Sequence, residues 1–235
     1  MISRAQKSLG IGFDGGVSLE LDRLSLLLGD SKESPLIIFD VGANIGSWTK
    51  EALRIFPSAE IHCFEPGQES FKNLSLNFQD VKNITLHKLA ISNQNKTVEL
   101  YSDFPGSGLA SLFDRKILMK PSKFLTRELV QASTLEQICE KFGKFPDILK
   151  LDIEGQEFHA LSGAKNILGE IKLIQFEFGG TDIDSRVFFR DIWDLLKEFN
   201  FEIFRITPYG LLFLEEYSEN LEIFIYTNYI AFKKH

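Results

Sequence analysis

Residues 36–46 read Leu-Ile-Ile-Phe-Asp-Val-Gly-Ala-Asn-Ile-Gly, and this stretch decides the fold. Its apolar start predicts a buried strand of a parallel sheet, and the Asp-x-Gly that closes the run predicts a sharp turn into a helix. Gly42 and Gly46 carry no Cβ atom, so a ligand could approach the backbone of the turn closely. Because open α/β sheets bind ligands at the carboxyl ends of their strands, we expect the turn to form part of a binding site.

The chemistry of the ligand is indicated by what the turn lacks and by the end of the next strand. The Gly-x-x-x-Gly spacing lacks the third glycine of Gly-x-Gly-x-x-Gly, the fingerprint that places a pyrophosphate on a helix N-terminus. Asp40 favours a cationic or zwitterionic ligand. A second apolar run, 61–64, ends in Glu65, where a carboxylate can hold both hydroxyls of a ribose. Together these features predict S-adenosylmethionine, a nucleoside with an amino acid and a positive charge but no phosphate.

Four blocks of the chain resemble the FkbM-type S-adenosylmethionine-dependent methyltransferases. The blocks are Phe-Asp-Val-Gly-Ala-Asn-Ile-Gly at 39–46, Phe-Glu-Pro at 64–66, Leu-Ala-Ile-Ser at 89–92 and Leu-Lys-Leu-Asp-Ile-Glu-Gly-Gln-Glu at 149–157. The likeness runs from about residue 35 to the C-terminus. It implies an α/β protein with the three-layer, Rossmann-like class I methyltransferase fold. The implied sheet is seven-stranded and mostly parallel, with the last strand inserted antiparallel.

Strand and helix signals alternate regularly from residue 35, which predicts a parallel sheet covered by helices on both faces. Expected strands span 36–41, 60–64, 83–88, 97–101, 147–152, 171–178, 201–206 and 223–232, and expected helices span 45–56, 67–78, 133–142, 155–168 and 184–198. Residues 1–34 are expected to form a capping segment, whose leucine-rich helix either closes part of the cofactor cleft or only covers the sheet. Residues 35–235 are the expected methyltransferase domain, with an irregular acceptor-side loop at about 102–132.

Length, composition and charge limit the class of protein. With 235 residues, 44% of them apolar, the chain can form one large α/β domain. The net charge of −7 disfavours binding to a nucleic-acid backbone. No apolar run reaches the roughly 18 residues of a membrane span, and no apolar signal core follows Met1, so we expect a cytoplasmic protein. Cys63 and Cys139 are expected to be reduced, buried thiols.

The cofactor contacts are expected along the turn and at the ends of the next two strands. The residues expected to bind are Asp40, Gly42, Asn44 and Gly46 for the methionine part, Glu65 for the ribose and, by resemblance to the family, Ala90 and Ser92 for the adenine. Asp40 would act on the ammonium directly or through water, and its alternative role is to orient the amides of the turn. The alternative for Glu65 is an exposed carboxylate at a strand end.

Methyl transfer from a sulfonium requires alignment, exclusion of water and removal of a proton from the acceptor. The expected catalytic residues are Lys150, Asp152, Glu154 and Glu177. Clustered carboxylates raise one another's pKa and could tune a general base, although the helix dipole also explains acids such as Glu154 and Glu157. Oxygens of Asp152, Glu154 and Glu177 could also hold Mg²⁺ or Ca²⁺, so a metal requirement is left open.

One basic segment interrupts the acidic chain and is the expected site of acceptor recognition. Its members are Arg115, Lys116, Lys120, Lys123 and Arg127, with no acidic residue between 115 and 127. These side chains could meet a phosphate or carboxylate of an anionic acceptor, or they could form a solvated surface patch.

The expected reaction is O-methylation of a small-molecule or glycan hydroxyl by in-line displacement with a carboxylate base. An NAD-dependent oxidoreductase is one alternative, which the missing third glycine opposes. A non-catalytic adenosylmethionine-binding module is another. A nucleic-acid methyltransferase is the remaining enzyme alternative, and the absence of an Asn/Asp-Pro-Pro-Tyr/Phe motif removes its amino-methylating subclass. The sequence does not specify the oligomeric state.

Overall fold

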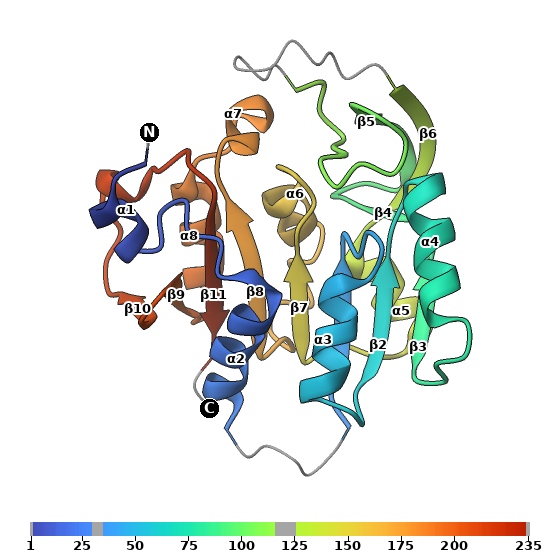
Figure 1. The fold of residues 1–235 in the computed structure, drawn as a ribbon, viewed down its shortest axis with the longest axis horizontal. Helices are drawn as coiled ribbons and strands as arrows, with labels where there is room; N and C mark the ends of the chain where they lie inside the picture. The colour runs from blue at the N-terminus through green and yellow to red at the C-terminus, as the bar shows by residue number, and fades with distance from the viewer. Residues whose placement is uncertain (1, 30–34, 116–125, 234–235) are drawn as a thin grey trace.

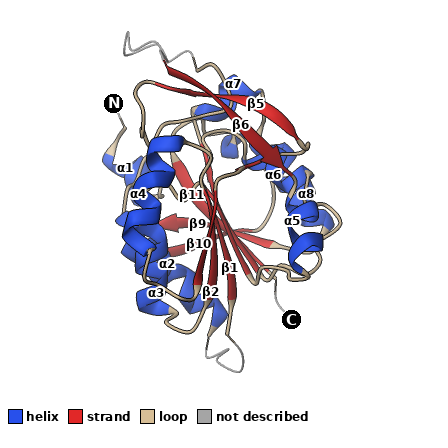
Figure 2. Ribbon diagram, turned by 90° about the vertical axis from the view of Figure 1, so that its right-hand side faces the viewer, coloured by secondary structure: helices blue, strands red, loops and turns tan. Residues whose placement is uncertain are grey.

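A computed structural model describes residues 2–29, 35–115 and 126–233 of the chain. A large sheet lies between two sets of helices, and a smaller sheet crosses the end of the molecule at which the parallel strands finish (Figure 1, Figure 2). The strand order of the large sheet is β10-β9-β11-β8-β7-β1-β2-β3. This arrangement confirms the three-layer, Rossmann-like α/β fold that the sequence predicted.

Six strands of the large sheet run in one direction. They are β1 (Ile37–Val41), β2 (Glu60–Phe64), β3 (Ile84–His87), β7 (Ile148–Leu151), β8 (Leu173–Phe178) and β9 (Glu202–Thr207). Strand β11 (Thr227–Phe232) lies between β8 and β9 and runs antiparallel to both, as the family resemblance implied. Strand β10 (Gly210–Leu214) pairs antiparallel with β9 at the sheet edge. The sheet therefore has eight strands rather than seven, because the chain turns back at Pro208 and Tyr209 and adds a hairpin strand.

Helices cover both faces of the sheet (Figure 2). One face carries α2 (Gly16–Leu28), α3 (Ser47–Ile55) and α4 (Gln68–Phe78), and the other carries α5 (Leu135–Phe142), α6 (Glu157–Ser162) and α8 (Phe189–Glu198). In α8 the apolar residues Phe189, Ile192, Trp193 and Leu196 recur at helical spacing and are all buried. The amphipathic pattern thus fixes which face of each helix packs on the sheet.

Two expected helices are shorter than their sequence patterns suggest. Helix α6 ends at Ser162, and Gly163 then passes so close to β4 that a Cβ atom on it would lie 2.6 Å from the carbonyl oxygen of Ser92. The helix expected at 184–198 is divided into α7 (Thr181–Ser185) and α8, since Arg186 adopts a left-handed conformation with φ of 59°.

The second sheet corrects the expectation of an irregular loop at 102–132. It has the strand order β4-β6-β5, with β4 (Ala90–Ile91), β5 (Lys96–Ser102) and β6 (Thr126–Ser133). Strand β5 pairs antiparallel with β6 over its full length, and β4 pairs parallel with the end of β6. Leu100, Val130 and Ala132 bury their side chains in a small apolar cluster of this sheet, together with Ala90. The last part of the expected loop, from Thr126, is therefore a strand of an ordered sheet.

The N-terminal segment is part of the main core. After the short helix α1 (Arg4–Ser8), helix α2 packs Leu21, Leu24 and Leu28 into the same apolar cluster as Trp48 of α3. In the described ranges no helix combines the length and apolarity needed to cross a bilayer. Cys63 and Cys139 are both buried free thiols, as predicted, and burial raises the pKa of each to about 12.

Candidate active site

The turn after β1 brings two strand ends into direct contact. The amides of Gly42 and Ala43 both donate to the carbonyl of Phe64, at 3.0 and 3.1 Å. Gly42 has φ of +79°, and a Cβ atom there would lie 1.9 Å from the carbonyl oxygen of Asp152. Gly42 lines both of two adjoining cavities, together called the cleft, as expected. Its missing side chain makes room for the chain after β7 as well as for a ligand.

Gly46 lies behind the site rather than in it. It has φ of +89°, and a Cβ atom on it would lie 2.1 Å from the ring of Phe78 on α4. Gly46 is not among the described residues that line the cleft. The expected contact with the methionine part is therefore not supported, because this glycine serves the close packing of α3 against α4.

Asp40 and Lys150 form a buried ion pair under the turn. Asp40 has no exposed surface, and its oxygens lie 2.9 Å from Lys150 Nζ and 2.5 Å from the donating hydroxyl of Thr49. Lys150 also donates to the Gly42 carbonyl at 2.9 Å. Burial by itself would lower the pKa of Lys150, but Asp40 and then Asp152 outweigh that effect and raise it. The expected contact of Asp40 with the ammonium does not fit, since Asp40 is covered and anchors the turn through Lys150.

A narrow cavity lies between the two sheets, with Glu65 at its edge. The Glu65 carboxylate is buried and accepts hydrogen bonds from the amides of Asn44 at 2.9 Å and Gly67 at 2.8 Å. Burial is the main reason that its pKa rises to about 7, although the two amides oppose the shift. Most other walls of this cavity are apolar: Val41, Phe64, Pro66, Leu89, Ala90, Ile91, Leu100, Ala110 and Leu112.

Of the remaining residues expected to bind the cofactor, two line the narrow cavity and one does not. Asn44 lines the cleft in a left-handed conformation with φ of 50°, and among the described residues no donor reaches its buried Oδ1. Ala90 lines the narrow cavity as expected. Ser92 does not line it, because its amide donates to Ser133 and its side chain faces Gln156. Gln156, which the sequence analysis missed, lines the cavity in its place.

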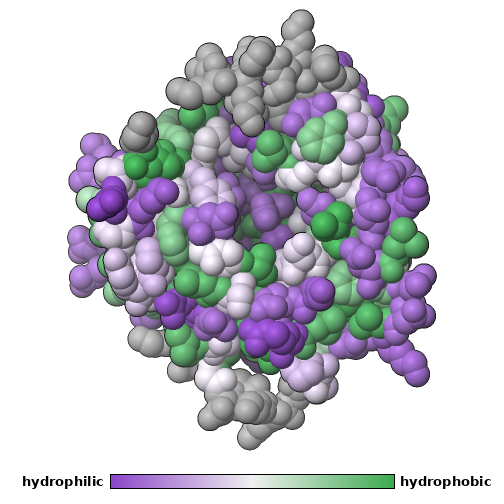
Figure 3. Space-filling model, viewed as in Figure 1, coloured by the Kyte–Doolittle hydropathy of each residue, from purple (hydrophilic) through white to green (hydrophobic). Residues whose placement is uncertain are grey.

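A wider cavity of about 400 Å³ adjoins the narrow one over the ends of β1, β7 and β8. Asp152, Glu154 and Glu177 all line it, so the structure brings together the acids that the sequence singled out. In Figure 3 this face is hollowed near its centre, and hydrophilic residues lie in the hollow. Gly42, Asn44, Asp152 and Glu154 line both cavities, so a ligand in one adjoins a ligand in the other.

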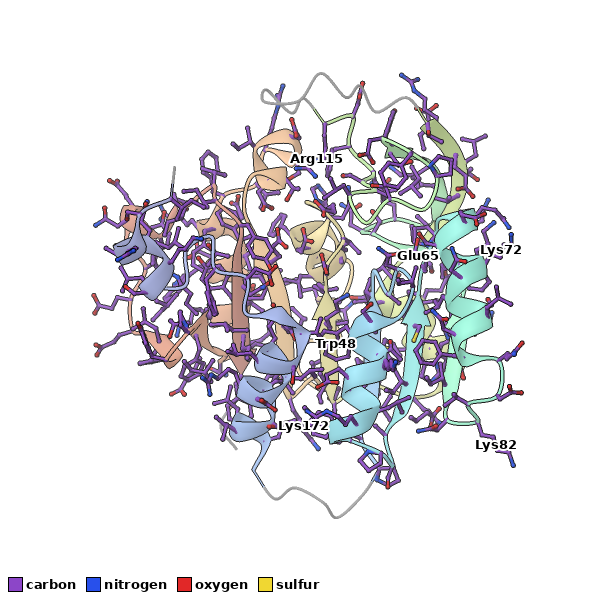
Figure 4. All side chains as sticks on the ribbon, viewed as in Figure 1. Trp48, Glu65, Lys72, Lys82, Arg115 and Lys172 are labelled. Atoms are coloured by element: carbon purple, nitrogen blue, oxygen red, sulfur yellow. The ribbon has the colours of Figure 1, made fainter. Side chains whose placement is uncertain are left out.

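Glu154 forms an ion pair with Arg115. Arg115 donates to Glu154 Oε2 at 2.8 Å and lies 4.0 Å from Asp184, and Ser111 donates to the Glu154 carbonyl at 2.7 Å. Burial raises the pKa of Glu154 to about 8, against the effect of Arg115. Figure 4 shows Arg115 beside α7 and Glu65 apart from it, close to α4.

The other acids of the cleft differ in how they are held. Both oxygens of Glu157 accept backbone amides, those of Ile153 and Gly155 at 2.8 Å each, so this residue fixes the turn after β7. Lys150 lies 3.7 Å from Asp152, whose side chain is about half exposed at 52%. Within the described residues, no donor reaches the carboxylate of Glu177, and burial, followed by Asp152, raises its pKa well above the ordinary value. Glu177 is thus the least restrained carboxylate of the cleft.

A polar network on the floor of the wide cavity was missed by the sequence analysis. Glu20 of α2 accepts hydrogen bonds from Gln175 at 2.8 Å and from Asn228 at 2.6 Å, and Gln175 accepts one from Trp48 at 3.2 Å. Burial raises the pKa of Glu20 to about 7. The available signal was a glutamate between two leucines of an apolar helical stripe, because a charged residue on a buried face needs partners.

The basic segment does not gather at the cleft in the described part of the chain. Lys116, Lys120 and Lys123 lie outside the described residues. Arg127 lies on β6, over the ring of Tyr101, and is largely exposed. Across residues 2–29, 35–115 and 126–233, no group of three or more His, Cys, Asp or Glu side chains is arranged to hold a metal ion.

The strand order and the helices on both faces are those of the Rossmann-like class I methyltransferase fold. One solved structure, an rRNA methylase from Streptococcus thermophilus, superposes with a TM-score of 0.51 at 11% identity, covering 92% of this chain and 95% of that one, which supports the fold alone. The family described as the methyltransferase FkbM domain matches residues 40–203. The chain therefore belongs to the FkbM methyltransferases, which use S-adenosylmethionine.

Two relatives of established name are similar over most of their length. The 2-O-methyltransferase NoeI of Sinorhizobium fredii is 25% identical over 175 residues, covering 69% of this chain and 72% of the relative. The hexuronic acid methyltransferase AglP of Haloferax volcanii is 25% identical over 184 residues, covering 76% of this chain and 68% of the relative.

The residues present fit the family's cofactor. Glu65 stands at the tip of β2 beside an apolar cavity that suits an adenine, and Asn44 Oδ1 is a buried acceptor without a donor among the described residues. Among the described residues, those that line the narrow cavity and carry a charge are all acidic: Glu65, Asp152 and Glu154. A diphosphate would be repelled there, whereas a cationic, phosphate-free nucleoside would be attracted. The site therefore also disfavours the NAD alternative.

Proposed function

We propose that this protein transfers a methyl group from S-adenosylmethionine to a hydroxyl oxygen of a small molecule or glycan. The observation that supports this most directly is the pair of adjoining cavities, one shaped for a nucleoside and the other lined by carboxylates. The names of NoeI and AglP, a 2-O-methyltransferase and a hexuronic acid methyltransferase, favour oxygen and sugars as the methylated atom and acceptor class.

We assign the cofactor-binding roles by position. Glu65 accepts the ribose hydroxyls, and the apolar wall around Ala90 holds the adenine by exclusion of water. Asn44 and the Gly42 backbone border the methionine part. Asp40 and Lys150 position this turn from below, with the Lys150 ammonium held by Asp40 and by the Gly42 carbonyl.

We assign the proton transfer to Glu177. The cofactor supplies a methyl group on a positively charged sulfur, so the enzyme must align the acceptor oxygen and remove its proton. Glu177 lines the wide cavity, its carboxylate accepts no hydrogen bond within the described residues, and burial raises its pKa, which makes its ionised form a stronger base. Asp152 lies at the junction of both cavities and is placed to orient the acceptor, while Glu154 is held by Arg115.

No metal enters this assignment. Arg115 already occupies one of the three carboxylates that could have formed an oxygen site, and the reaction needs only a base. An anionic acceptor, one possibility raised by the basic segment, is also not carried forward, because Arg115 is paired with Glu154. A cytoplasmic location and a capping role for residues 1–34 remain predictions.

Calorimetry with S-adenosylhomocysteine, the demethylated cofactor, tests the cofactor site. We expect binding at micromolar affinity or better, and a loss of about 1 to 3 kcal/mol in Glu65→Ala, because a buried acceptor of hydrogen bonds is removed. Glu69→Ala is the matched control, since Glu69 is an exposed glutamate on the next turn. The assignment fails if the native protein does not bind, or if both variants bind as tightly as the native protein.

A labelled-methyl assay tests the reaction itself. Glycans and hydroxylated natural products are offered as acceptors with labelled S-adenosylmethionine, and the methylated atom is located by NMR. Label on a hydroxyl oxygen supports the proposal, whereas label on nitrogen or carbon contradicts it.

A further inference from the structure

The wide cavity has one end that the proposed chemistry does not use. This end lies between α2 and β11, where Glu20, Gln175 and Asn228 are hydrogen-bonded together. Glu20 and Asn228 both lie outside the 40–203 segment that matches the family, and they are 208 residues apart in the chain. The segments that carry them are therefore where this chain can differ from its relatives in what it binds.

The network holds its polar groups in fixed orientations. The indole of Trp48 donates to Gln175 Oε1, which directs the amide nitrogen of Gln175 to Glu20 Oε2 at 2.8 Å. Asn228 Nδ2 donates to Glu20 Oε1 at 2.6 Å and to the hydroxyl oxygen of Tyr226 at 2.8 Å. Each Glu20 oxygen thus keeps a lone pair, and the Tyr226 hydroxyl keeps its proton. A fixed acceptor stands beside a fixed donor on the cavity wall.

This end is too far from Glu65 to belong to the cofactor. From β2, which carries Glu65, the sheet runs through β1, β7 and β8 to β11. Four steps of strand spacing place Asn228 about 19 Å from the tip of β2. The sulfur of adenosylmethionine is bonded to the ribose, and its amino-acid tail reaches about one strand spacing further. The α2–β11 end therefore lies on the acceptor side, next to Glu177, which pairs in register with Asn228.

The charges around the wide cavity limit what the acceptor can carry. Lys150 is the only basic residue among the described side chains that line it, and it is already paired with Asp40. The acidic lining residues are Asp14, Glu20, Asp152, Glu154 and Glu177. A carboxylate or phosphate on the acceptor would be repelled at this wall.

We propose that the α2–β11 end of the cavity is a subsite for neighbouring hydroxyls of an uncharged sugar ring, with Glu20 accepting one hydrogen bond and Tyr226 donating another. This inference rests on the proposed function and adds the charge class of the acceptor and the residues that select it. A subsite that hydrogen-bonds a hydroxyl rejects an analogue without that hydroxyl, because its own polar groups would be left unpaired.

Saturation-transfer NMR on the protein saturated with S-adenosylhomocysteine tests the subsite. The probes are the methyl glycosides of glucose, mannose and galactose, the 2-deoxy form of each, and methyl glucuronide as the anionic counterpart. The variants are Asn228→Ala and Tyr226→Phe, and Asp22→Asn on the solvent side of α2 is the matched control. Calorimetry measures the affinity of every variant for S-adenosylhomocysteine and so shows whether the variant is folded and its cofactor site is intact.

We expect at least one neutral glycoside to bind, methyl glucuronide to bind at least fivefold more weakly, and each of the two subsite variants to lose roughly tenfold in sugar affinity. Asp22→Asn should behave as the native protein, and the affinity for S-adenosylhomocysteine should change less than twofold throughout. The inference is overturned if no neutral sugar binds, if the glucuronide binds best, or if sugar binding survives both subsite variants. It is also overturned if those variants lower the affinity for S-adenosylhomocysteine tenfold, because this end of the cavity would then bind the amino-acid part of the cofactor. Failure of the native protein to bind S-adenosylhomocysteine would instead contradict the proposed function.

Discussion

Charged residues that lie close together in this protein have different roles, and their sequence positions do not show which of them hold the turn and which line the cavity. Asp40 and Lys150 lie on neighbouring strands, paired in register, and neutralise each other under the turn. Glu177 and Asp152 stand at strand ends with their carboxylates on the cavity. All four are charged residues near one sheet edge. Lys150 also lines the cavity, but buried Asp40 neutralises its charge, so we assign the substrate contacts to the two strand-end carboxylates.

Glu177→Gln should abolish most turnover while leaving the cofactor site intact. Removal of a general base commonly lowers the rate by about 10² to 10⁴ fold. We therefore expect kcat to fall by at least 100-fold in the labelled-methyl assay, with unchanged affinity for S-adenosylhomocysteine. Glu198→Gln, on the exposed end of α8, is the control and should retain full activity. Normal turnover in Glu177→Gln would move the base to another carboxylate.

Lys150→Met should destabilise the fold because it leaves Asp40 buried without its partner. Breaking one side of a buried ion pair costs about 3 to 5 kcal/mol. Lys172→Met is the matched control, since Lys172 forms a partly exposed pair with Asp147 at 2.8 Å and such pairs contribute about 0 to 1 kcal/mol. Urea unfolding of the two variants measures both free energies, and equal losses would contradict the role given to the buried pair.

At the level of helices and strands, the site depends on close packing around the first turn. Helix α3 begins directly after Gly46, where the φ of +89° and the ring of Phe78 leave no space for a side chain. The position of α3 then fixes Trp48, which faces α2 in Figure 4 and orders Gln175 below the wide cavity. A change in the packing of α3 against α4 would therefore shift Trp48 and Gln175 and alter the wall of the wide cavity.

Gly46→Ala should cost about 2 to 5 kcal/mol, the sum of left-handed backbone strain and overpacking against Phe78. Gly143→Ala is the control, because Gly143 has φ of +64° at the end of α5 but a Cβ atom there would meet nothing within 4 Å. That variant should lose only the backbone term, about 1 to 2 kcal/mol. Thermal unfolding distinguishes the two, and similar losses would show that the α3–α4 contact relaxes freely.

The molecule as a whole concentrates buried acids at one edge of the sheet. Burial raises the pKa of Glu20 and Glu65 to about 7 and that of Glu154 and Asp182 to about 8. Each of these groups therefore binds its proton more tightly in the folded state than in the unfolded chain. Ionising them in the ligand-free protein costs folding free energy.

Stability of the ligand-free protein should fall as the pH rises from about 5 to 8. The sign follows because the folded state holds more protons than the unfolded state across this interval, so the contribution is complete below pH 4.5 and is lost through the folded pKa values. Urea midpoints at pH 5, 6, 7 and 8 measure the trend. Glu154→Gln should reduce its slope, and a native midpoint that rises over this range would contradict the burial of neutral carboxyls.

Much of the fold could be predicted because its signals are local. The apolar run and glycine turn at 37–46 gave β1 and the start of α3, and the run at 60–64 gave β2 within its observed bounds. The acids at strand tips, Glu65, Asp152 and Glu177, were found because the carboxyl ends of parallel strands meet at one edge. Strands β10 and β6 were missed because each depends on a partner strand for its identity.

The amino-acid sequence alone was enough to predict the parallel sheet, a phosphate-free nucleoside as the ligand and the family. The reason is that the glycine turn, the strand periodicity and the acids at strand tips are each encoded in a short stretch of the sequence. Tertiary structure decided which charges face the ligand. Asp40 and Gly46 sit in the same turn as Asn44, yet burial against Lys150 and Phe78 removes them from the cavity. Glu20 enters it only because α2 packs against the sheet near β11, and although a glutamate in an apolar helical stripe indicates that it needs partners, no local pattern identifies a partner 208 residues away.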